Sequence, residues 1–142
     1  MKAQKGFTLV EILIVVVILG ILAAIVVPQF TQASTEAKTN SLCSNLQSMR
    51  SQIELYKVQH NDNPPNAGDG DPTFEQQMVY CTDINGDING DGSKLRDATY
   101  AFGPYLERVP NNPFTNGNVI GEDWLYDETT GEISAPAPHD EY

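Results

Sequence analysis

The chain begins with a long, unbroken run of apolar side chains. Residues 12–27 contain no charged or strongly polar side chain, and Phe7, Leu9 and Val10 extend the run toward the N-terminus. As an α-helix, the stretch Phe7–Val27 would be about 31 Å long, which matches a hydrocarbon core of about 30 Å. The pattern predicts one membrane-spanning helix at the start of the chain.

Beyond this run the pattern becomes amphipathic. Apolar side chains recur every three or four residues, which is typical of a helix that packs one face against a core. They form a single stripe: Leu42, Leu46, Met49, Ile53 and Tyr56. Because Phe30–Gln59 contains neither glycine nor proline, we expect the helix to run from Phe7 to Gln59, about 80 Å.

Pro28 lies between the two halves of this predicted helix. A proline inside a helix removes one backbone hydrogen bond and crowds the carbonyl of the residue four places earlier, here Ala24. Two interpretations follow: Pro28 ends the first helix, or it bends a helix that continues. The helical pattern beyond Pro28 favours the bend.

The pattern of residues 60–142 predicts a small, loop-rich head. Residues 60–72 are rich in Pro, Gly, Asn and Asp, which end the helix. A short helix is expected over Phe74–Cys81, and a hairpin over Trp124–Asp127 and Glu132–Ser134, joined by Glu128–Gly131. The fold class is therefore α+β, a long N-terminal helix packed on a small C-terminal antiparallel β-sheet.

Two further segments near the C-terminus complete the predicted head. Val119–Ile120 is expected to supply a further short strand. The tail Ala135–Tyr142, with prolines at 136 and 138, is expected to be extended or disordered.

The charge is distributed as unevenly as the hydrophobicity. The 142 residues, enough for one domain of ordinary size, carry 19 acidic and 8 basic side chains, a formal net charge of −11. Residues 60–142 hold 16 of the acids and only three bases. Such a head repels phosphate, so no nucleic-acid partner is expected. Lys2 and Lys5 precede the span, which places the N-terminus in the cytoplasm and the head outside.

Glu11 is a carboxylate within the predicted membrane segment. Such a group costs a few kcal/mol in lipid unless it is paired or neutralised. Nothing in the span itself offers a partner, so we expect a group from another molecule, such as a free α-amino group, to pair with it. The alternative is a side chain that reaches the lipid headgroups.

The decapeptide Lys5–Ile14 (KGFTLVEILI) resembles the class III signal sequence of type IV pilins and of type II secretion pseudopilins. The resemblance implies that a prepilin peptidase cuts after Gly6 and methylates Phe7. It also implies that Glu11 pairs with the N-terminal ammonium of a neighbouring subunit, and that Pro28 bends a continuous helix. The alternative is an ordinary secretory signal peptide cleaved near Leu22–Ala24.

The segment Tyr105–Phe114, with its Pro-x-x-Pro-Phe ending, resembles the loop that precedes the sheet in major pseudopilins. The resemblance implies a pilin-like chain divided into a leader (1–6), a transmembrane and filament-core helix (7–28), an amphipathic helix of the head (29–59) and an acidic head (60–142).

As function, the resemblance implies a structural subunit of a type II secretion pseudopilus, which assembles through its N-terminal helix into a filament that drives protein export. The alternative is a type IV pilus subunit for adhesion, motility or DNA uptake. The implied partners are further copies of the chain, minor pilins or pseudopilins, the prepilin peptidase and the inner-membrane assembly platform. The chain would cross the inner membrane once with a periplasmic head, then join a filament in the periplasm or at the cell surface.

The head also contains a tandem Asp-Ile-Asn-Gly repeat at residues 83–90. Side-chain oxygens at alternate positions with intervening glycines suit Ca²⁺. The segment from Asp87 resembles the start of an EF-hand or dockerin-type loop, although Ala98 stands at its closing position. Two interpretations of this segment remain, a calcium site and a solvated cluster of turns. If calcium binds, the expected ligands are Asp83, Asp87, Asn89, Asp91 and Asp97.

The two cysteines, Cys43 and Cys81, allow one disulfide. An outward-facing head lies in an oxidising compartment, which favours pairing. The alternative is two separate thiols, since the sequence does not show whether the Cα atoms come close enough.

We expect no enzyme. The only histidines, His60 and His139, lie in the breaker segment and the tail, and no catalytic or phosphate-binding motif is present. A second class, a binding module that captures DNA or a surface, is disfavoured for DNA by the acidic head. An electron-conducting filament would rest only on scattered aromatic residues, which are explained by packing.

Overall fold

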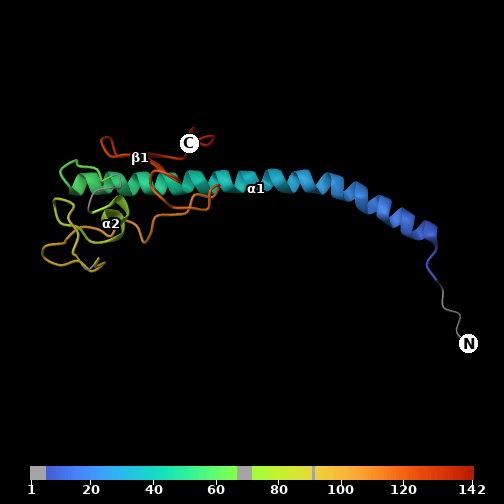
Figure 1. Ribbon diagram of the computed structural model, residues 1–142, viewed down its shortest axis with the longest axis horizontal. Coiled ribbons are helices and arrows are strands. Elements are labelled where there is room, and N and C mark those ends of the chain that lie inside the picture. The colour runs from blue at the N-terminus through green and yellow to red at the C-terminus, as the bar shows by residue number, and fades with distance from the viewer. Residues whose placement is uncertain (1–5, 67–71, 91) are drawn as a thin grey trace, which may run out of the picture. The chain divides into compact units, whose positions relative to one another are not determined.

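The computed structural model describes residues 6–66, 72–90 and 92–142. It contains four elements, labelled in Figure 1: α1 (Leu9–Gln59), α2 (Phe74–Val79), β1 (Leu125–Asp127) and β2 (Glu132–Ser134). The chain divides into two units, up to Ala37 and from Lys38 to Tyr142, which are described in turn.

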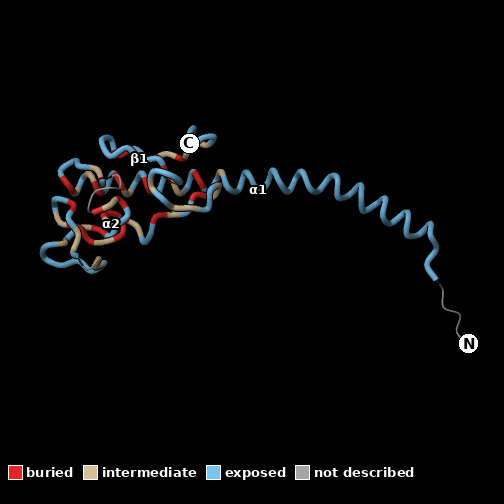
Figure 2. Tube along the Cα trace, viewed as in Figure 1, coloured by how far each residue is buried: buried red, intermediate tan, exposed pale blue. Residues whose placement is uncertain are grey.

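The first unit is the N-terminal part of α1. Its described side chains are all exposed, as the unbroken pale blue of Figure 2 shows. Among the large apolar side chains of residues 9–27, the exposed fraction ranges from 49% at Val15 to 83% at Leu9. Since these residues bury nothing within the chain, the helix here must meet lipid or other helices.

Pro28 lies inside α1, which continues through it to Gln59. The interpretation that Pro28 ends the helix is therefore wrong, and the predicted continuous helix is confirmed, with its first residue at Leu9. Near the proline, the Thr31 hydroxyl donates to the Val27 carbonyl oxygen at 3.2 Å, and the Thr35 hydroxyl donates to the Thr31 carbonyl oxygen at 3.1 Å. Such bonds from a side chain to the preceding turn are common in helices.

The second unit has one hydrophobic core, built on the predicted stripe of α1. All five stripe residues are buried, with exposed fractions of 2% or less. The cluster is completed by side chains from α2, the loops and the sheet: Phe74, Met78, Tyr105, Val109, Trp124, Ile133 and Ala135. The amphipathic pattern thus correctly predicted which face of α1 packs.

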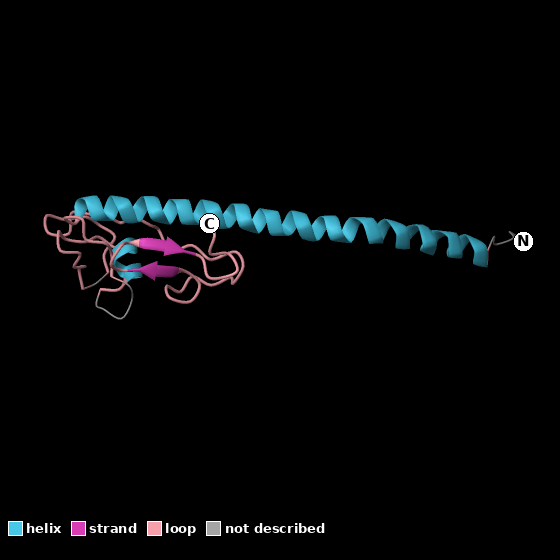
Figure 3. Cartoon of the chain, turned by 90° about the horizontal axis from the view of Figure 1, so that it is seen from above, coloured by secondary structure: helices cyan, strands magenta, loops and turns pink. Residues whose placement is uncertain are grey.

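The sheet is a single antiparallel hairpin, with Leu125 opposite Ser134 and Asp127 opposite Glu132. Figure 3 shows the two strands beside the later part of α1. Ile133 points into the core from β2, at 0% exposure. The hairpin and the α+β class are confirmed. Val119–Ile120 forms no strand: Ile120 makes only an isolated bridge to Trp124, so that expectation was wrong.

The tail is packed against the head, contrary to the expectation that it is extended or disordered. Ala135 is fully buried, and the His139 ring stacks on Phe114 at a centroid distance of 3.7 Å. Arg50 of α1 donates from Nη2 to the Tyr142 carbonyl oxygen at 2.7 Å. These contacts join residues far apart in sequence, so local composition could not predict them.

Candidate assembly site

Glu11 accepts two hydrogen bonds at the beginning of α1. The backbone N–H and the hydroxyl of Thr8 both donate to Glu11 Oε2, each at 2.8 Å. In return the Glu11 N–H donates to Thr8 Oγ1 at 3.2 Å. This reciprocal arrangement is a capping box, which satisfies backbone donors that a helix N-terminus leaves free.

Thr8 is a site residue that the sequence reasoning missed. No residue that the structure describes forms an ion pair with Glu11, but Thr8, three residues earlier at capping-box spacing, donates hydrogen bonds to it. The Ser/Thr-x-x-Glu spacing was the available signal. Oε1 of Glu11 accepts no hydrogen bond from any residue that the structure describes, so one oxygen remains open to a further donor.

Gly6 and Phe7 precede α1 and are exposed. The Phe7 side chain is 80% exposed, and no atom outside its immediate neighbours lies within 4 Å of the position a Cβ would take at Gly6. The peptide bond between them is thus outside the helix, as a peptidase requires. The rest of the predicted leader, Met1–Lys5, lies outside the described residues.

Among the described residues, α1 is the one helix long and apolar enough to cross a membrane. Glu11 is the only charged residue between Gly6 and Glu36. The apolar helix therefore presents one polar feature, close to its start.

The predicted calcium ligands do not converge in the described part of the chain. Asp83 Oδ1 accepts from the N–H groups of Asn85 and Asp87, at 2.8 and 3.0 Å, and so caps its own turn. Asp97 Oδ1 accepts two backbone N–H groups in the same manner.

Asn89 is half-buried in the same segment, and Asp91 lies outside the described residues. No group of three or more His, Cys, Asp or Glu side chains among the residues described is placed to hold a metal ion. Calcium binding stays a prediction.

The predicted disulfide is not formed. Cys43 is an exposed free thiol on α1, whereas Cys81 is a buried free thiol whose pKa is raised by that burial. Thr82, next to Cys81, bonds His60 through its hydroxyl at 3.0 Å. His60 follows Cys43 by 17 residues, about 25 Å along a helix, whereas disulfide-linked Cα atoms lie about 4–7 Å apart.

Both histidines serve packing. The His60 ring is buried, stacks on Tyr56 at 3.8 Å, and lies between the Tyr56 carbonyl oxygen (2.8 Å from Nδ1) and Thr82 Oγ1. It thereby ties the loop after α2 to the end of α1. His139 holds the tail on Phe114.

A membrane-length apolar helix that continues into a small acidic head, with a single glutamate near its start, defines a pilin-like subunit. Residues 1–27 match the family described as the prokaryotic N-terminal methylation motif.

Relatives match beyond this helix. The chain is 30% identical over 115 residues to type II secretion system core protein G of Aeromonas hydrophila, covering 81% of this chain and 71% of that protein. It is 36% identical to the core protein G of Klebsiella michiganensis over 113 residues (80% and 70%). For that of Dickeya chrysanthemi, the identity is 38% over 113 residues (80% and 65%).

The chain belongs to the pseudopilin family of type II secretion system core protein G. It is a membrane-anchored pseudopilus subunit. No solved structure matches it.

Proposed function

We propose that the chain assembles through the N-terminal part of α1 into the pseudopilus and that this filament drives protein export. The observation that carries the proposal is the apolar helical segment Leu9–Val27, whose side chains are all exposed, with Glu11 near its beginning. A helix with this surface is stable only in lipid or against similar helices. The secretion relatives favour export over a surface pilus.

Cleavage after Gly6 creates the group that Glu11 needs. It exposes an ammonium at Phe7, which the peptidase methylates, and leaves the whole apolar helix on the mature subunit. Thr8 satisfies one Glu11 oxygen while the subunit is alone in the membrane. During assembly, the ammonium of a neighbouring copy pairs with the carboxylate, because two unpaired ions out of water are far costlier than one ion pair.

This ion pair would also fix the axial position of each subunit. A single polar group in an otherwise apolar interface specifies register, because any shift leaves it unpaired. The partners that act on the chain are the prepilin peptidase, the inner-membrane assembly platform and minor pseudopilins. The head faces the periplasm because Lys2 and Lys5 keep the N-terminus in the cytoplasm.

The test replaces the core protein G of a type II secretion system with this chain. Electron microscopy and an assay of the exported protein then measure filaments and secretion. The proposal predicts both for the parent chain and neither for Gly6→Leu, which retains its leader. A membrane-inserted and cleaved parent chain that forms no filaments would contradict the proposal.

A further inference from the structure

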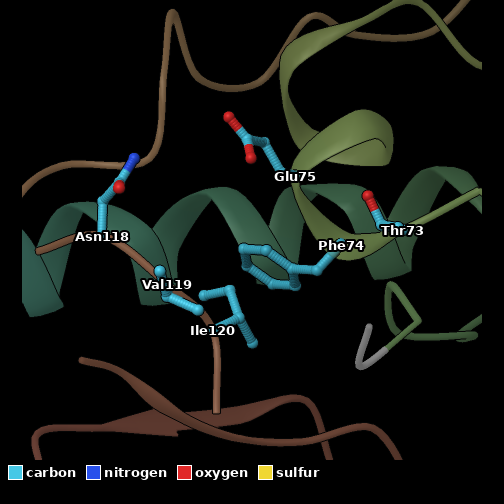
Figure 4. Close-up of a pocket in the computed structure, with 6 residues that line it drawn as sticks. All are labelled: Thr73, Phe74, Glu75, Asn118, Val119 and Ile120. Carbon is cyan, nitrogen blue, oxygen red and sulfur yellow. The ribbon is translucent and has the colours of Figure 1, made fainter. Parts of the chain in front are cut away.

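The head carries a small cleft with an apolar floor and an acidic rim. It lies between the beginning of α2 and the segment 118–120, and its volume is about 220 Å³. Figure 4 shows Val119 and Ile120 close to the Phe74 ring, with the Glu75 carboxylate above the ring in this view. Val119 is 50% exposed, so part of the apolar floor is accessible.

The walls of this cleft are held in place before anything binds. Thr73 caps α2 with a complete capping box. On the other side, Asp123 Oδ2 accepts the Val119 N–H at 2.9 Å, which fixes the segment 118–120. The N–H of the exposed Glu122 donates to the Val119 carbonyl oxygen at 3.4 Å, which also holds this segment. A preformed site of this kind loses little entropy when it is filled.

The same head carries a projecting apolar side chain between two cations. Leu95 is 81% exposed, and Lys94 and Arg96 flank it. Lys94 Nζ donates to the Glu107 carbonyl oxygen at 3.0 Å, and Arg96 Nε donates to the Gly103 carbonyl oxygen at 2.6 Å. Each of these two side chains uses one N–H for its own loop and stays exposed, so both positive charges remain accessible beside Leu95.

The two features are complementary in chemistry. One is a leucine with two neighbouring positive charges, and the other is a cleft whose apolar residues, Phe74, Val119 and Ile120, lie with the acidic Glu75 in its lining. Lys94 and Arg96 are two of only three bases among residues 60–142. Elsewhere on the head, the 16 acids would make two copies repel each other, so this is the loop best suited to approach an acidic surface.

We propose that Leu95 of one copy occupies the cleft of a second copy of this chain, with Lys94 and Arg96 facing its acidic rim. The proposal deepens the proposed function and rests on it, since the second copy is the next subunit of the filament. Leu95 and the cleft are different surfaces of one chain, so the contact is heterologous, and in a helical filament it repeats from each subunit to the next.

The contact is too small to hold two subunits alone. One leucine in a cleft buries far less than the 1,200–2,000 Å² of a stable interface. It therefore acts with the packed N-terminal helices and sets the orientation of neighbouring heads. We therefore expect that Leu95 does not occupy the cleft of another copy when the subunits are dispersed in detergent.

The test is disulfide crosslinking of assembled filaments in a Cys43→Ser background, where only buried Cys81 remains. Mild oxidation of a chain with both Leu95→Cys and Val119→Cys should give a ladder of dimers and higher oligomers. Two co-expressed copies that each carry one of these cysteines should stop at the dimer. Glu75→Lys added to the double variant should strongly reduce the ladder.

The matched control is Val58→Cys with Val119→Cys, because Val58 is as exposed as Leu95, at 80%. A ladder of equal intensity from this pair, dimers from Leu95→Cys alone, or crosslinks only to a different protein would each overturn the contact. Normal filaments without a ladder would overturn it while leaving the proposed function intact. A parent chain that forms no filaments would overturn both.

Discussion

Asn112 connects the two ends of the loop between residues 110 and 124. It is 2% exposed, its Nδ2 donates to the Asp123 carbonyl oxygen at 2.8 Å, and its Oδ1 accepts the Phe114 N–H at 2.9 Å. The Trp124 indole N–H donates across the same loop to the Pro110 carbonyl oxygen at 2.9 Å. The Pro-x-x-Pro-Phe segment thus has a structural role, since it places Phe114 and Trp124 against the core.

We predict that Asn112→Ala lowers the free energy of unfolding by about 2 kcal/mol or more, because it strands one donor and one acceptor at about 1–3 kcal/mol each. Urea unfolding followed by Trp124, the only tryptophan, measures this. The control is Asn111→Ala, whose side chain is exposed and should change stability by less than about 0.5 kcal/mol. Equal effects from the two variants would refute the role of Asn112.

The two Asp-Ile-Asn-Gly repeats have identical sequences and different environments. Gly86 is buried at a φ of +87°, and an added Cβ would lie against the Tyr56 hydroxyl and 2.8 Å from Gln77 Nε2. Gln77 Nε2 also donates to the Gly86 carbonyl oxygen at 2.9 Å. At Gly90, by contrast, nothing lies within 4 Å of the added atom. The glycine of the first repeat is therefore packed against core side chains, whereas that of the second repeat is not.

Gly86→Ala should therefore destabilise the head, by about 1–2 kcal/mol from the left-handed backbone alone and more from the steric overlap. Gly90→Ala in the matched repeat should be close to neutral. Urea unfolding of both variants decides this. A result in which Gly90→Ala costs as much as Gly86→Ala would contradict the different environments of the two repeats.

At the scale of elements, the hairpin is fixed by an aspartate in its turn. The backbone N–H groups of Thr129 and Thr130 donate to Asp127 Oδ1, and they hold the pKa of Asp127 below its ordinary range. Asp123 behaves similarly: the Thr115 hydroxyl and the Val119 N–H lower its pKa. Both groups accept these bonds more strongly when they are ionised, so protonation weakens the bonds.

An aspartate whose pKa is lower in the folded than in the unfolded chain stabilises the fold. This stabilisation is complete at pH values above the unfolded-state pKa, and it is lost as the pH falls through the folded-state pKa. The stability of the head should thus fall below about pH 4, the ordinary aspartate range. Asp127→Asn should make that decline shallower, and the exposed control Glu107→Gln should not. Urea unfolding at stepped pH values measures it; identical pH profiles for Asp127→Asn and the parent would contradict it.

The calcium prediction also belongs to one element, the loop 83–97. Calorimetry of the detergent-solubilised chain with Ca²⁺ tests it, and the prediction is heat that disappears in Asp87→Asn. Asp83 and Asp97 cap their own turns, so changing either would also disturb the loop. Asp87 is therefore the better residue to change. Absence of heat at millimolar calcium would end the prediction and leave the loop as a solvated turn.

The sequence predicted correctly those elements that depend on the spacing of neighbouring residues along the chain. The helical spacing from Leu42 to Tyr56 identified the buried face of α1, and the Gly131 turn identified the hairpin. Glu11 was recognised as a site residue because a lone carboxylate in an apolar run is costly. Thr8 was missed although its Thr-x-x-Glu spacing to Glu11 is a local pattern that predicts a capping box.

The failures concern contacts between distant segments. The disulfide failed because Cys81 lies near His60 rather than near Cys43. The tail was misjudged because its stack on Phe114 and its bond to Arg50 are not encoded in its own composition.

At the scale of the whole molecule, the chain joins two chemically different parts. Once residues 1–6 are removed, the helix from Phe7 to Gln59 is formally neutral, and the 13 excess negative charges all lie beyond it. In the proposed filament, attraction between subunits comes from apolar helix packing and the Glu11 ion pair, whereas the net charge of the heads opposes their approach.

The measurement that tests the central claim most directly is the assembly of Glu11→Ala subunits. Three properties are measured on the same cells: membrane insertion, removal of residues 1–6 and the number of filaments seen by electron microscopy. The account predicts that insertion and cleavage remain normal while filaments are lost, and that Glu36→Ala, another exposed glutamate of α1, retains them. Normal filaments from the Glu11→Ala chain would contradict the account.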